Sequence, residues 1–420
     1  MRRALHVIAW FAGALLLLIV LGLAALYSFL TVFGNTIPRD ALDPSLQETI
    51  RGEPITSSEV WEQEKPLLRE LFEREVYGAF PQTSLSFTHE RRVLDDAAYD
   101  GRATVEEVVL VSDEAGLRIP IVLITPHAEA PVPLIVASTF CASHTAFPEY
   151  PVEKPAVYPG MCDQENSQGI VHTIFGTYID RFPVERLLDE GYALASFYTG
   201  SIVPDSNEHA PEALARLSEV STKPVSGIIS AWAWGYTQVM HALEVDRRLD
   251  PSRIALYGHS RDGKAALLAG AFDESVDAVI AHQSGTGGVK PSRRNVGESL
   301  QSMMENYPLW FDTQFLTYAG QEEGLPIDQH FLVAMMAPRP LLATGARQDK
   351  WADPKGSFMA LRDAEYVYEL YTGRDAFTAE KLTNFMPNDP LAFFMRPLSH
   401  GTRESDWEAF ITFLNAHFKN

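Results

Sequence analysis

Residues Ile254–Ala269 read IALYGHSRDGKAALLA, which joins an apolar run to an alanine-rich run through a turn at Gly258. The pattern predicts a short strand, a sharp turn that presents Ser260, and a helix, which together form a nucleophile elbow. In such a turn the serine hydroxyl is exposed, and the next backbone N–H can face a developing oxyanion. The usual form has glycine two residues after the serine, but here Asp262 stands there and Gly263 follows. A serine that merely caps a helix is the alternative interpretation.

Strand and helix patterns alternate along most of the chain. Short apolar runs of strand length are followed by longer runs with helical periodicity, and the first strands mix alternation with apolar stretches. This order predicts a doubly wound, mostly parallel sheet with helices on both faces, preceded by antiparallel strands. The other expected strands are Leu85–Leu94, Ala103–Val111, Leu117–Thr125, Pro133–Ser138, Tyr192–Phe197, Val276–Ala281, Arg339–Thr344 and Leu391–Met395. The expected helices include Glu59–Tyr77, Arg181–Glu190, Val225–Leu249, Pro354 to about Leu370, and Glu404–Phe418, with an irregular insertion over Gly200–Ser221.

Three side chains follow predicted strands: Ser260, Asp349 and His400. In sheets of this type, functional groups lie in loops at the carboxyl ends of the strands. A serine hydroxyl becomes a useful nucleophile when an imidazole removes its proton, and a carboxylate fixes the tautomer of that imidazole. The order serine, aspartate, histidine is that of α/β-hydrolases, so we expect an α/β-hydrolase fold. Each assignment has an alternative. Asp349 could be a solvated loop acid and His400 a loop histidine without a role, and the nearby Asp353 could serve as the N-cap of the next helix.

The composition is that of a globular protein, because 46% of the 420 residues are hydrophobic and 21% are charged. The chain has 34 Lys and Arg against 55 Asp and Glu, a formal charge of −21, and it has no basic run. Nucleic acid is therefore not an expected partner. No pair of histidines has the spacing of metal ligands on a helix, so we expect neither a metal nor a cofactor.

The N-terminus carries an apolar run over residues 4–33, without Asp, Glu, Lys or Arg between Arg3 and Arg39. About 20 apolar residues are enough to span a bilayer, and the arginines before the run favour a cytoplasmic N-terminus. We expect an uncleaved signal anchor, with a cleaved signal peptide as the alternative. The rest of the chain would then be exported and held at the inner membrane, in the periplasm or outside. The expected divisions are an anchor (1–34), a linker (35–57) and a catalytic domain (58–420).

The chain has two cysteines, Cys141 and Cys162, on either side of a proline-rich loop. Export would permit a disulfide, but the distance between the two thiols does not follow from sequence. The pairing is therefore left open here.

Several motifs are more specific than a serine elbow alone. They are Gly258–Lys264, Ala231–Gly235, Gln283–Gly288, Asp328–His330, Ala337–Leu341 and Asp349–Pro354. Through them the chain resembles the bacterial branch of the glucuronoyl esterases, carbohydrate esterase family fifteen, over roughly Ser58–Phe418. The pattern Gly-x-Ser-Arg-x-Gly-Lys in that family also accounts for the displaced glycine.

The resemblance implies a serine esterase that cleaves the ester between (4-O-methyl-)glucuronic acid of glucuronoxylan and lignin alcohols. It implies Ser260 as nucleophile, His400 as base and Arg261 as the residue that stabilises the oxyanion, which also makes electrostatic sense. It further implies a sugar site formed by Lys264, Glu298 and Trp351. From residue type alone, the alternatives are that Lys264 is a solvated helix charge, Glu298 a surface acid and Trp351 a packed loop aromatic.

The chain departs from the family pattern in two places. Some members carry a glutamate where Gln283 stands, so the acid role falls to Asp349 here. Cys141 and Ala142 replace small residues of the oxyanion loop. Two other functions stay open, namely an acetyl-xylan or general carboxylesterase and a catalytically silent carbohydrate-binding protein on the same fold.

Overall fold

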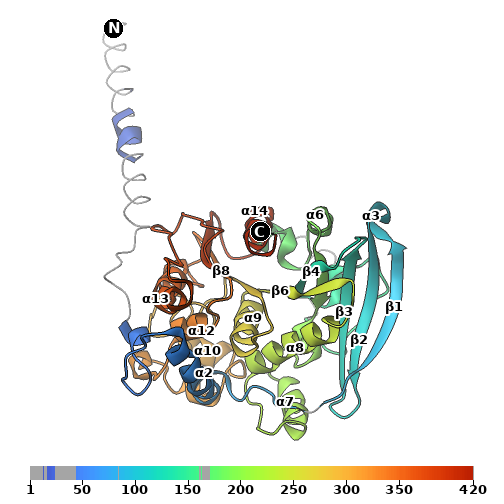
Figure 1. The fold of residues 1–420 in the computed structure, drawn as a ribbon, viewed down its shortest axis with the longest axis horizontal. Coiled ribbons are helices and arrows are strands. Elements are labelled where there is room, and N and C mark those ends of the chain that lie inside the picture. Colours follow the sequence, from blue (N-terminus) through green and yellow to red (C-terminus); the bar gives the residue numbers. More distant parts are fainter. Residues whose placement is uncertain are drawn as a thin grey trace, which may run out of the picture.

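The structure of the protein is a computed structural model that describes residues 13, 17–23, 44–83, 85–159, 162 and 171–419. The described residues form a nine-stranded sheet in the order β1-β2-β3-β5-β4-β6-β7-β8-β9 (Figure 1). The strands are β1 (Thr88–Ala97), β2 (Ala103–Ser112), β3 (Leu117–Pro126), β4 (Val132–Ser138), β5 (Ala193–Phe197), β6 (Leu249–His259), β7 (Ala278–His282), β8 (Leu341–Ala346) and β9 (Leu391–Arg396).

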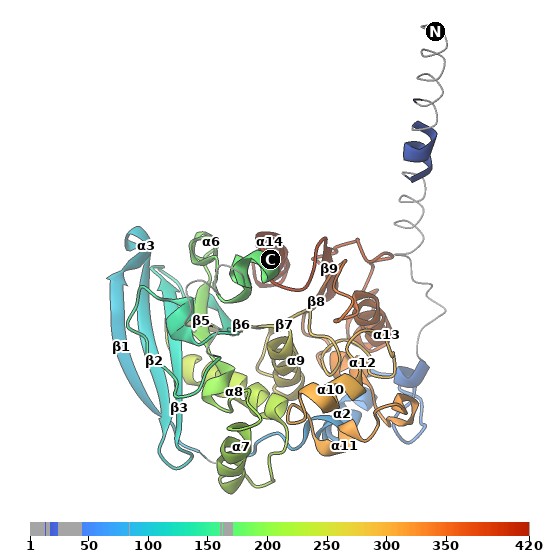
Figure 2. The same ribbon diagram turned by 180° about the vertical axis from the view of Figure 1, so that it is seen from behind.

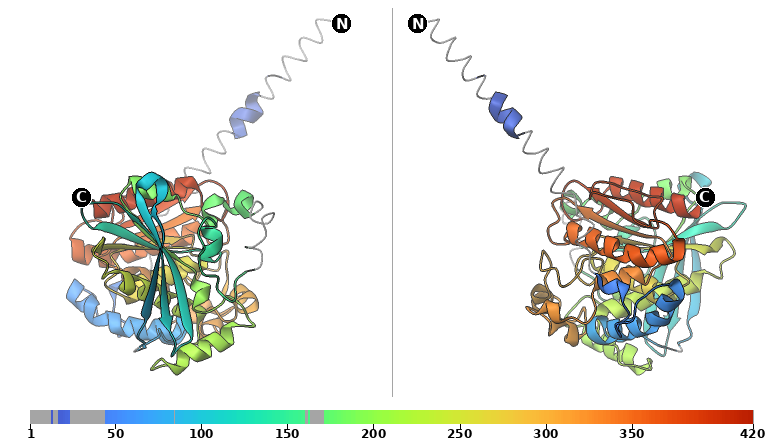
Figure 3. Two further views of the ribbon diagram at one scale, coloured as in Figure 1. Left: turned by 90° about the vertical axis from the view of Figure 1, so that its right-hand side faces the viewer. Right: turned by 60° about the vertical axis from the view of Figure 1, so that its left-hand side comes forward.

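The sheet is antiparallel at one end and parallel over the rest. Strands β1, β2, β3 and β5 pair antiparallel, whereas β5, β4, β6, β7, β8 and β9 pair parallel. The central parts of the parallel strands are mostly apolar and buried, as expected where helices cover both faces, and Leu134–Ala137 has no exposed surface. Figure 3 shows the twist of the antiparallel strands at the edge of the sheet. The predicted mixed, mostly parallel sheet is therefore confirmed.

Helices pack on both faces of this sheet (Figures 1 and 2). One hydrophobic cluster lies between the sheet and α2, α7, α8, α9, α12 and α13, and the other lies between the sheet and α6 and α14. The longer helices are α2 (Ser58–Phe72), α7 (Ala210–Glu219), α8 (Ile228–Leu243), α9 (Arg261–Phe272), α13 (Pro354–Thr372) and α14 (Glu404–Phe418). The shorter ones are α3 (Ala98–Gly101), α4 (Ser143–Ala146), α6 (Val184–Asp189), α10 (Leu300–Asn306), α11 (Thr313–Leu316) and α12 (Gln329–Ala334).

The alanine-rich composition of α9 lets this helix lie close against the sheet. Ala265, Ala266 and Ala269 are fully buried, and a Cβ added to Gly270 would collide with the side chain of Val279 on β7. Small side chains on the packed face bring the helix axis near the strands. The start of α9, which carries Ser260 at its N-cap, is thus held firmly at the end of β6.

Two predicted segments differ from the structure by more than a shift of a few residues at their ends. The insertion predicted as irregular contains α7, whose Ala213, Leu214 and Leu217 are buried at helical spacing. The helix predicted over Val225–Leu249 is shorter, because α8 ends at Leu243 and Leu249 already begins β6.

The N-terminal predictions lie mostly outside the described residues. Of the predicted membrane span, residues 13 and 17–23 are described, and they are helical. Within the described part of the chain, no helix combines the length and hydropathy needed to cross a membrane. Residues 44–57, predicted as linker, pack on the sheet domain, since Leu46 and Ile55 are buried in its core.

Candidate active site

Ser260 lies at a strained turn between β6 and α9. Its backbone angles are φ 57° and ψ −121°, a region that non-glycine residues rarely occupy. The turn is tight because a Cβ at Gly258 would collide with the carbonyl of Asp262, and one at Gly263 would lie 2.8 Å from the carbonyl oxygen of Gly258. The backbone N–H of Ser260 donates to the carbonyl of His282 at 2.8 Å, which ties the turn to β7. The predicted elbow is therefore present, with its glycine at 263.

His400 and Asp349 come together from the loops after β9 and β8. Nδ1 of His400 lies 2.7 Å from Oδ2 of Asp349, and the Asp349 side chain is 1% exposed. The second carboxylate oxygen accepts the backbone N–H of Ala352 at 3.1 Å. Ser260 and His400 both line a cavity of about 330 Å³. The three side chains predicted to act together thus lie at one edge of the sheet.

Two further histidine rings pack in a row next to His400. The ring of His259 lies 4.6 Å from that of His400 and 4.9 Å from that of His282. Burial, with repulsion from His400 and His282, holds the pKa of His259 well below its ordinary value. Burial also holds the pKa of His282 well below the ordinary range. Both rings are therefore neutral at pH 7, and they add no positive charge beside the imidazole of His400.

Gln283 occupies the position where some relatives of this sequence pattern carry an acid. Its Oε1 accepts the backbone N–H of Gly401 at 2.9 Å, and its side chain is buried. The amide therefore supports the loop of His400 through the backbone. In this structure the carboxylate that contacts the imidazole ring of His400 is Asp349.

Arg261 is held at the cavity by groups that sequence reasoning missed. Its guanidinium pairs with the carboxylate of Asp205, which also accepts Nε1–H of Trp310 at 2.8 Å. The guanidinium lies 4.8 Å from the ring centre of Phe140 and 5.5 Å from that of Trp310, within cation–π range. Burial lowers the pKa of Arg261, yet the side chain keeps its charge because arginine titrates far above neutrality.

Lys264, Glu298 and Trp351 form a connected group at the cavity. The Lys264 ammonium donates at 2.7 Å to the carbonyls of Ser284 and Thr286 and to Oε2 of Glu298. Oε1 of Glu298 accepts Nε1–H of Trp351 at 3.1 Å. Glu298 and Trp351 line the cavity, whereas Lys264 is fully buried and uses its three N–H donors inside the protein. The structure therefore places Lys264 behind Glu298.

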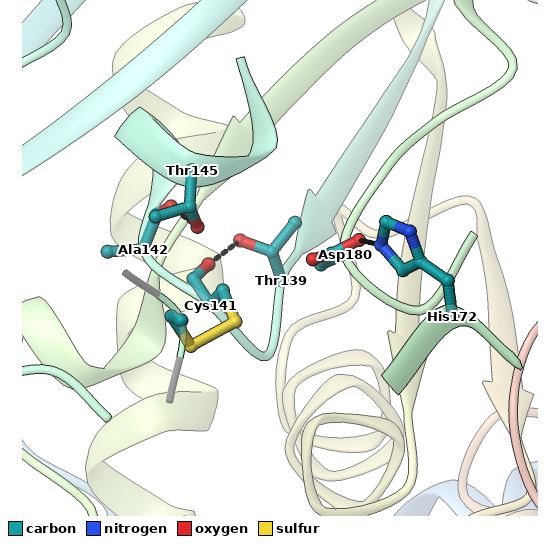
Figure 4. Close-up of a disulfide and its surroundings, with 7 residues drawn as sticks. Thr139, Cys141, Ala142, Thr145, His172 and Asp180 are labelled. Carbon is teal, nitrogen blue, oxygen red and sulfur yellow. Dashed lines mark hydrogen bonds and ion pairs between the residues drawn. A yellow bond between two sulfur atoms is a disulfide. The ribbon is translucent and has the colours of Figure 1, made fainter. Parts of the chain in front are cut away.

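The loop that carries Phe140 is closed by a disulfide between Cys141 and Cys162, whose Cα atoms are 5.7 Å apart. Figure 4 shows the disulfide together with Thr139, whose hydroxyl donates to the carbonyl of Cys141 at 2.6 Å. The pairing that sequence left open is thus present in the structure.

Another part of the cavity wall comes from segment 171–182, which includes the end of a long connection whose length is typical of functional rims. His172 and Asp180 brace this segment through a 2.7 Å contact between Nε2 and Oδ1 (Figure 4). The side chains that it gives to the cavity are mostly apolar, and they are Val171, Phe175, Tyr178, Ile179, Arg181 and Phe182. Proline-rich connections of this length offer no periodic pattern from which such a wall could be predicted.

A serine at a strand-to-helix turn, with an imidazole oriented by a buried carboxylate, is the arrangement found in serine hydrolases. The family model described as "Glucuronyl esterase, fungi" matches residues 170–372. Carbohydrate esterase MZ0003, from an unknown prokaryotic organism, is 30% identical over 390 residues, which are 88% of each chain. The 4-O-methyl-glucuronoyl methylesterase 1 of Wolfiporia cocos is 35% identical over 157 residues, 35% of this chain and 38% of its own.

Solved structures agree with these matches. The glucuronoyl esterase from Solibacter usitatus superposes with a TM-score of 0.79 at 30% identity, covering 91% of this chain and 99% of its own. A promiscuous esterase of carbohydrate esterase family 15, from a marine bacterial metagenome, gives 0.79 at 28% identity with the same coverage. The chain belongs to the glucuronoyl esterase family. It is a carboxylic ester hydrolase.

Proposed function

We propose that the protein is a serine esterase of the α/β-hydrolase type that hydrolyses the ester between (4-O-methyl-)glucuronic acid of glucuronoxylan and lignin alcohols. The observation that carries the proposal is one cavity that holds Ser260 and His400 together with Arg261, Glu298 and Trp351. The relatives named 4-O-methyl-glucuronoyl methylesterase support glucuronic acid as the acid part of the ester.

The proposed reaction runs through a covalent acyl-enzyme. Oγ of Ser260 attacks the ester carbonyl while Nε2 of His400 takes its proton, and the negative charge forms on the carbonyl oxygen. Arg261 stabilises that oxyanion with its guanidinium and its backbone N–H. The imidazolium then gives its proton to the departing alcohol oxygen as the carbon–oxygen bond breaks. Water, deprotonated by His400, cleaves the serine ester and releases the free acid.

The sugar ring has a matching surface beside the serine. Trp351 is 45% exposed, which leaves its indole face open to the ring, while its N–H is bound to Glu298. The side chain of Glu298 is buried and bound by the ammonium of Lys264, and its carboxylate oxygens can accept hydrogen bonds from sugar hydroxyls. In this proposal Glu298 and Trp351 contact the sugar, and Lys264 fixes the position of Glu298.

Hydrolysis of benzyl glucuronate by the purified protein tests the proposal against the alternatives. We expect turnover of the glucuronate ester well above that of acetylated xylan or p-nitrophenyl acetate, and loss of turnover in Ser260→Ala. A preference for the acetyl esters would favour the general carboxylesterase. Sugar binding without turnover of any ester would favour the catalytically silent protein.

We also propose that the domain is exported and anchored by the apolar run over residues 4–33. The disulfide between Cys141 and Cys162 supports an oxidising compartment. Fractionation of cells that produce the full chain tests this. Recovery with the membrane, and release of the domain by protease added to spheroplasts, is the expected result, whereas a soluble cytoplasmic protein would contradict it.

A further inference from the structure

We propose that a second cavity next to the active site binds the outer ring of a neutral two-ring aromatic alcohol while its ester bond lies at Ser260. The inference rests on the proposed function, since it concerns the alcohol side of the same ester. It goes further by assigning a separate binding site to a cavity outside the reacting centre.

The direction in which the alcohol leaves follows from the position of His400. The imidazolium must reach the departing oxygen, so the alcohol lies on the histidine side of the serine. The loop after His400 is packed on segment 171–182, because the backbone N–H of Thr402 donates to the carbonyl of Phe175 at 2.8 Å. A Cβ on Gly401 would collide with that same carbonyl, so the two backbones are in direct contact. The alcohol therefore meets the side chains of segment 171–182.

The same segment forms the boundary of the second cavity. Tyr178, Arg181 and Phe182 line both the active-site cavity and a neighbouring cavity of about 390 Å³. That volume is within the range of small-molecule pockets. Phe182 is held in place by a stacked contact with Phe147 at 6.1 Å and an edge contact with Trp407 at 5.7 Å. Phe182 therefore forms part of a rim that the two cavities share.

Tyr99 lines the second cavity from the turn that joins β1 to β2. Its angles are φ 55° and ψ 53°, and those of Asp100 are φ 60° and ψ 38°. Positive φ at two successive residues is the geometry of a tight turn between antiparallel strands, so Tyr99 is held at the tip of the hairpin that β1 and β2 form. Tyr99 lines the second cavity and not the first, so it is a specific probe of the second cavity.

The charges of the second cavity favour a neutral aromatic ligand. Arg181, which is half-buried in the shared wall, has no hydrogen-bond or ion-pair partner among the described residues. A guanidinium in that state stacks on aromatic rings and donates to ether or phenol oxygens. The carboxylates of Glu149, Glu185 and Glu404 and the guanidinium of Arg186 also line this cavity. The three acids outnumber the two arginines, which disfavours an anionic alcohol.

The inference can be tested with the purified full-length protein and three esters of glucuronic acid. Their alcohols are methanol, benzyl alcohol and 4-benzyloxybenzyl alcohol. All three give the same acyl-enzyme, so differences in kcat/KM arise before the alcohol has left. Benzyl and 4-benzyloxybenzyl alcohols are similar leaving groups. We therefore expect about tenfold higher kcat/KM for the two-ring ester than for the benzyl ester, which is the size of one good aromatic contact.

The variants Tyr99→Ala and Arg181→Ala should each lower the ratio of kcat/KM for the two-ring ester to that for the methyl ester. The ratio cancels any loss of correctly folded protein. Trp351→Ala, on the sugar side, should lower kcat/KM for all three esters by the same factor. The ratio of the two-ring ester to the methyl ester should therefore stay unchanged. Arg374→Ala removes an exposed arginine that lines neither cavity, and it should change neither the ratio nor the activity.

Equal kcat/KM for the benzyl and two-ring esters in the unmodified protein would overturn the inference while leaving the proposed function intact. The same holds if Tyr99→Ala leaves the ratio unchanged. If Tyr99→Ala instead weakens hydrolysis of a methyl ester whose glucuronic acid carries a xylo-oligosaccharide, the cavity holds polysaccharide and the inference is wrong. No hydrolysis of any of the three esters would overturn the proposed function and the inference together.

Discussion

Nδ1 of His400 and Oδ2 of Asp349 lie 2.7 Å apart, and this contact joins the loops that follow β9 and β8. Because Asp349 also accepts the N–H of Ala352, both of its oxygens have donors. A carboxylate held in this way keeps the proton of the imidazole on Nδ1. Nε2 of His400 is then free to accept a proton on the side of the cavity that Ser260 lines.

Asp349→Asn is expected to lower kcat for benzyl glucuronate by about 10⁴-fold, because an amide favours the wrong imidazole tautomer. The thermal unfolding midpoint should change by only a few degrees, since the amide fills the same space. The matched control is Asp353→Asn, which removes the nearby carboxylate that pairs with Arg294. A greater loss of turnover in the Asp353 variant would transfer the acid role to that residue.

Asp205→Asn should lower kcat/KM by about 10²-fold, the loss typical of one oxyanion donor, because Arg261 would lose its charged partner and its fixed position. Steady-state kinetics on benzyl glucuronate measures this. Asp250→Asn, at a surface pair with Arg253, is the control and should behave as the unmodified protein. Unchanged kinetics in the Asp205 variant would mean that Arg261 is positioned by its aromatic neighbours alone.

Lys264→Met is expected to lower the free energy of unfolding by about 3–5 kcal/mol, since it leaves the buried carboxylate of Glu298 without its cation. Burial already lowers the pKa of Lys264, which reflects the cost of placing a charge there. Urea unfolding compares it with Lys223→Met, which removes a half-exposed lysine from Glu73. The Glu73 carboxylate keeps its contact with Arg69, so this change should cost about 1 kcal/mol or less. Equal stability losses in the two variants would contradict the structural role of Lys264.

Asp262 should make stability depend on pH. Burial raises the pKa of Asp262 to about 6, above the ordinary value of 3.8. The folded state therefore binds the proton more tightly, and this stabilisation is present below pH 4 and lost as the pH rises through 6. Relative to the unmodified protein, Asp262→Asn should gain up to about 3 kcal/mol of stability between pH 4 and 7.

Urea unfolding of the Asp262 variant and the unmodified protein at several pH values measures this difference. Asp113→Asn, at an exposed turn, is the control, and its difference from the unmodified protein should stay nearly constant with pH. A constant difference for Asp262→Asn as well would show that its carboxyl titrates normally.

The sheet and the serine, histidine and aspartate positions could be predicted because their signals are local. Each of the three side chains directly follows a short apolar strand, and parallel strands end at one edge of the sheet. The elbow at Ser260 could also be predicted from sequence, because Gly258 and Gly263 leave room for the turn.

The partners of these residues could not be predicted in the same way. Asp205 meets Arg261 across 56 residues of sequence, from a segment without a periodic pattern. Lys264 was predicted to bind the sugar, with a solvated helix charge as the alternative, and its buried position could not be read from sequence. Its three acceptors are Glu298 and the carbonyls of Ser284 and Thr286 in the loop after β7. Such pairings depend on how the loops pack, and nothing in the local sequence encodes that.

The bond between Cys141 and Cys162 has a practical consequence for anyone who prepares this protein. It closes the loop next to Phe140, the aromatic ring on which the guanidinium of Arg261 rests. Material made in a reducing cytosol would lack this tether, although its sheet would be complete. Thiol-free handling and secretion-based expression are therefore the conditions under which a preparation represents the intact molecule.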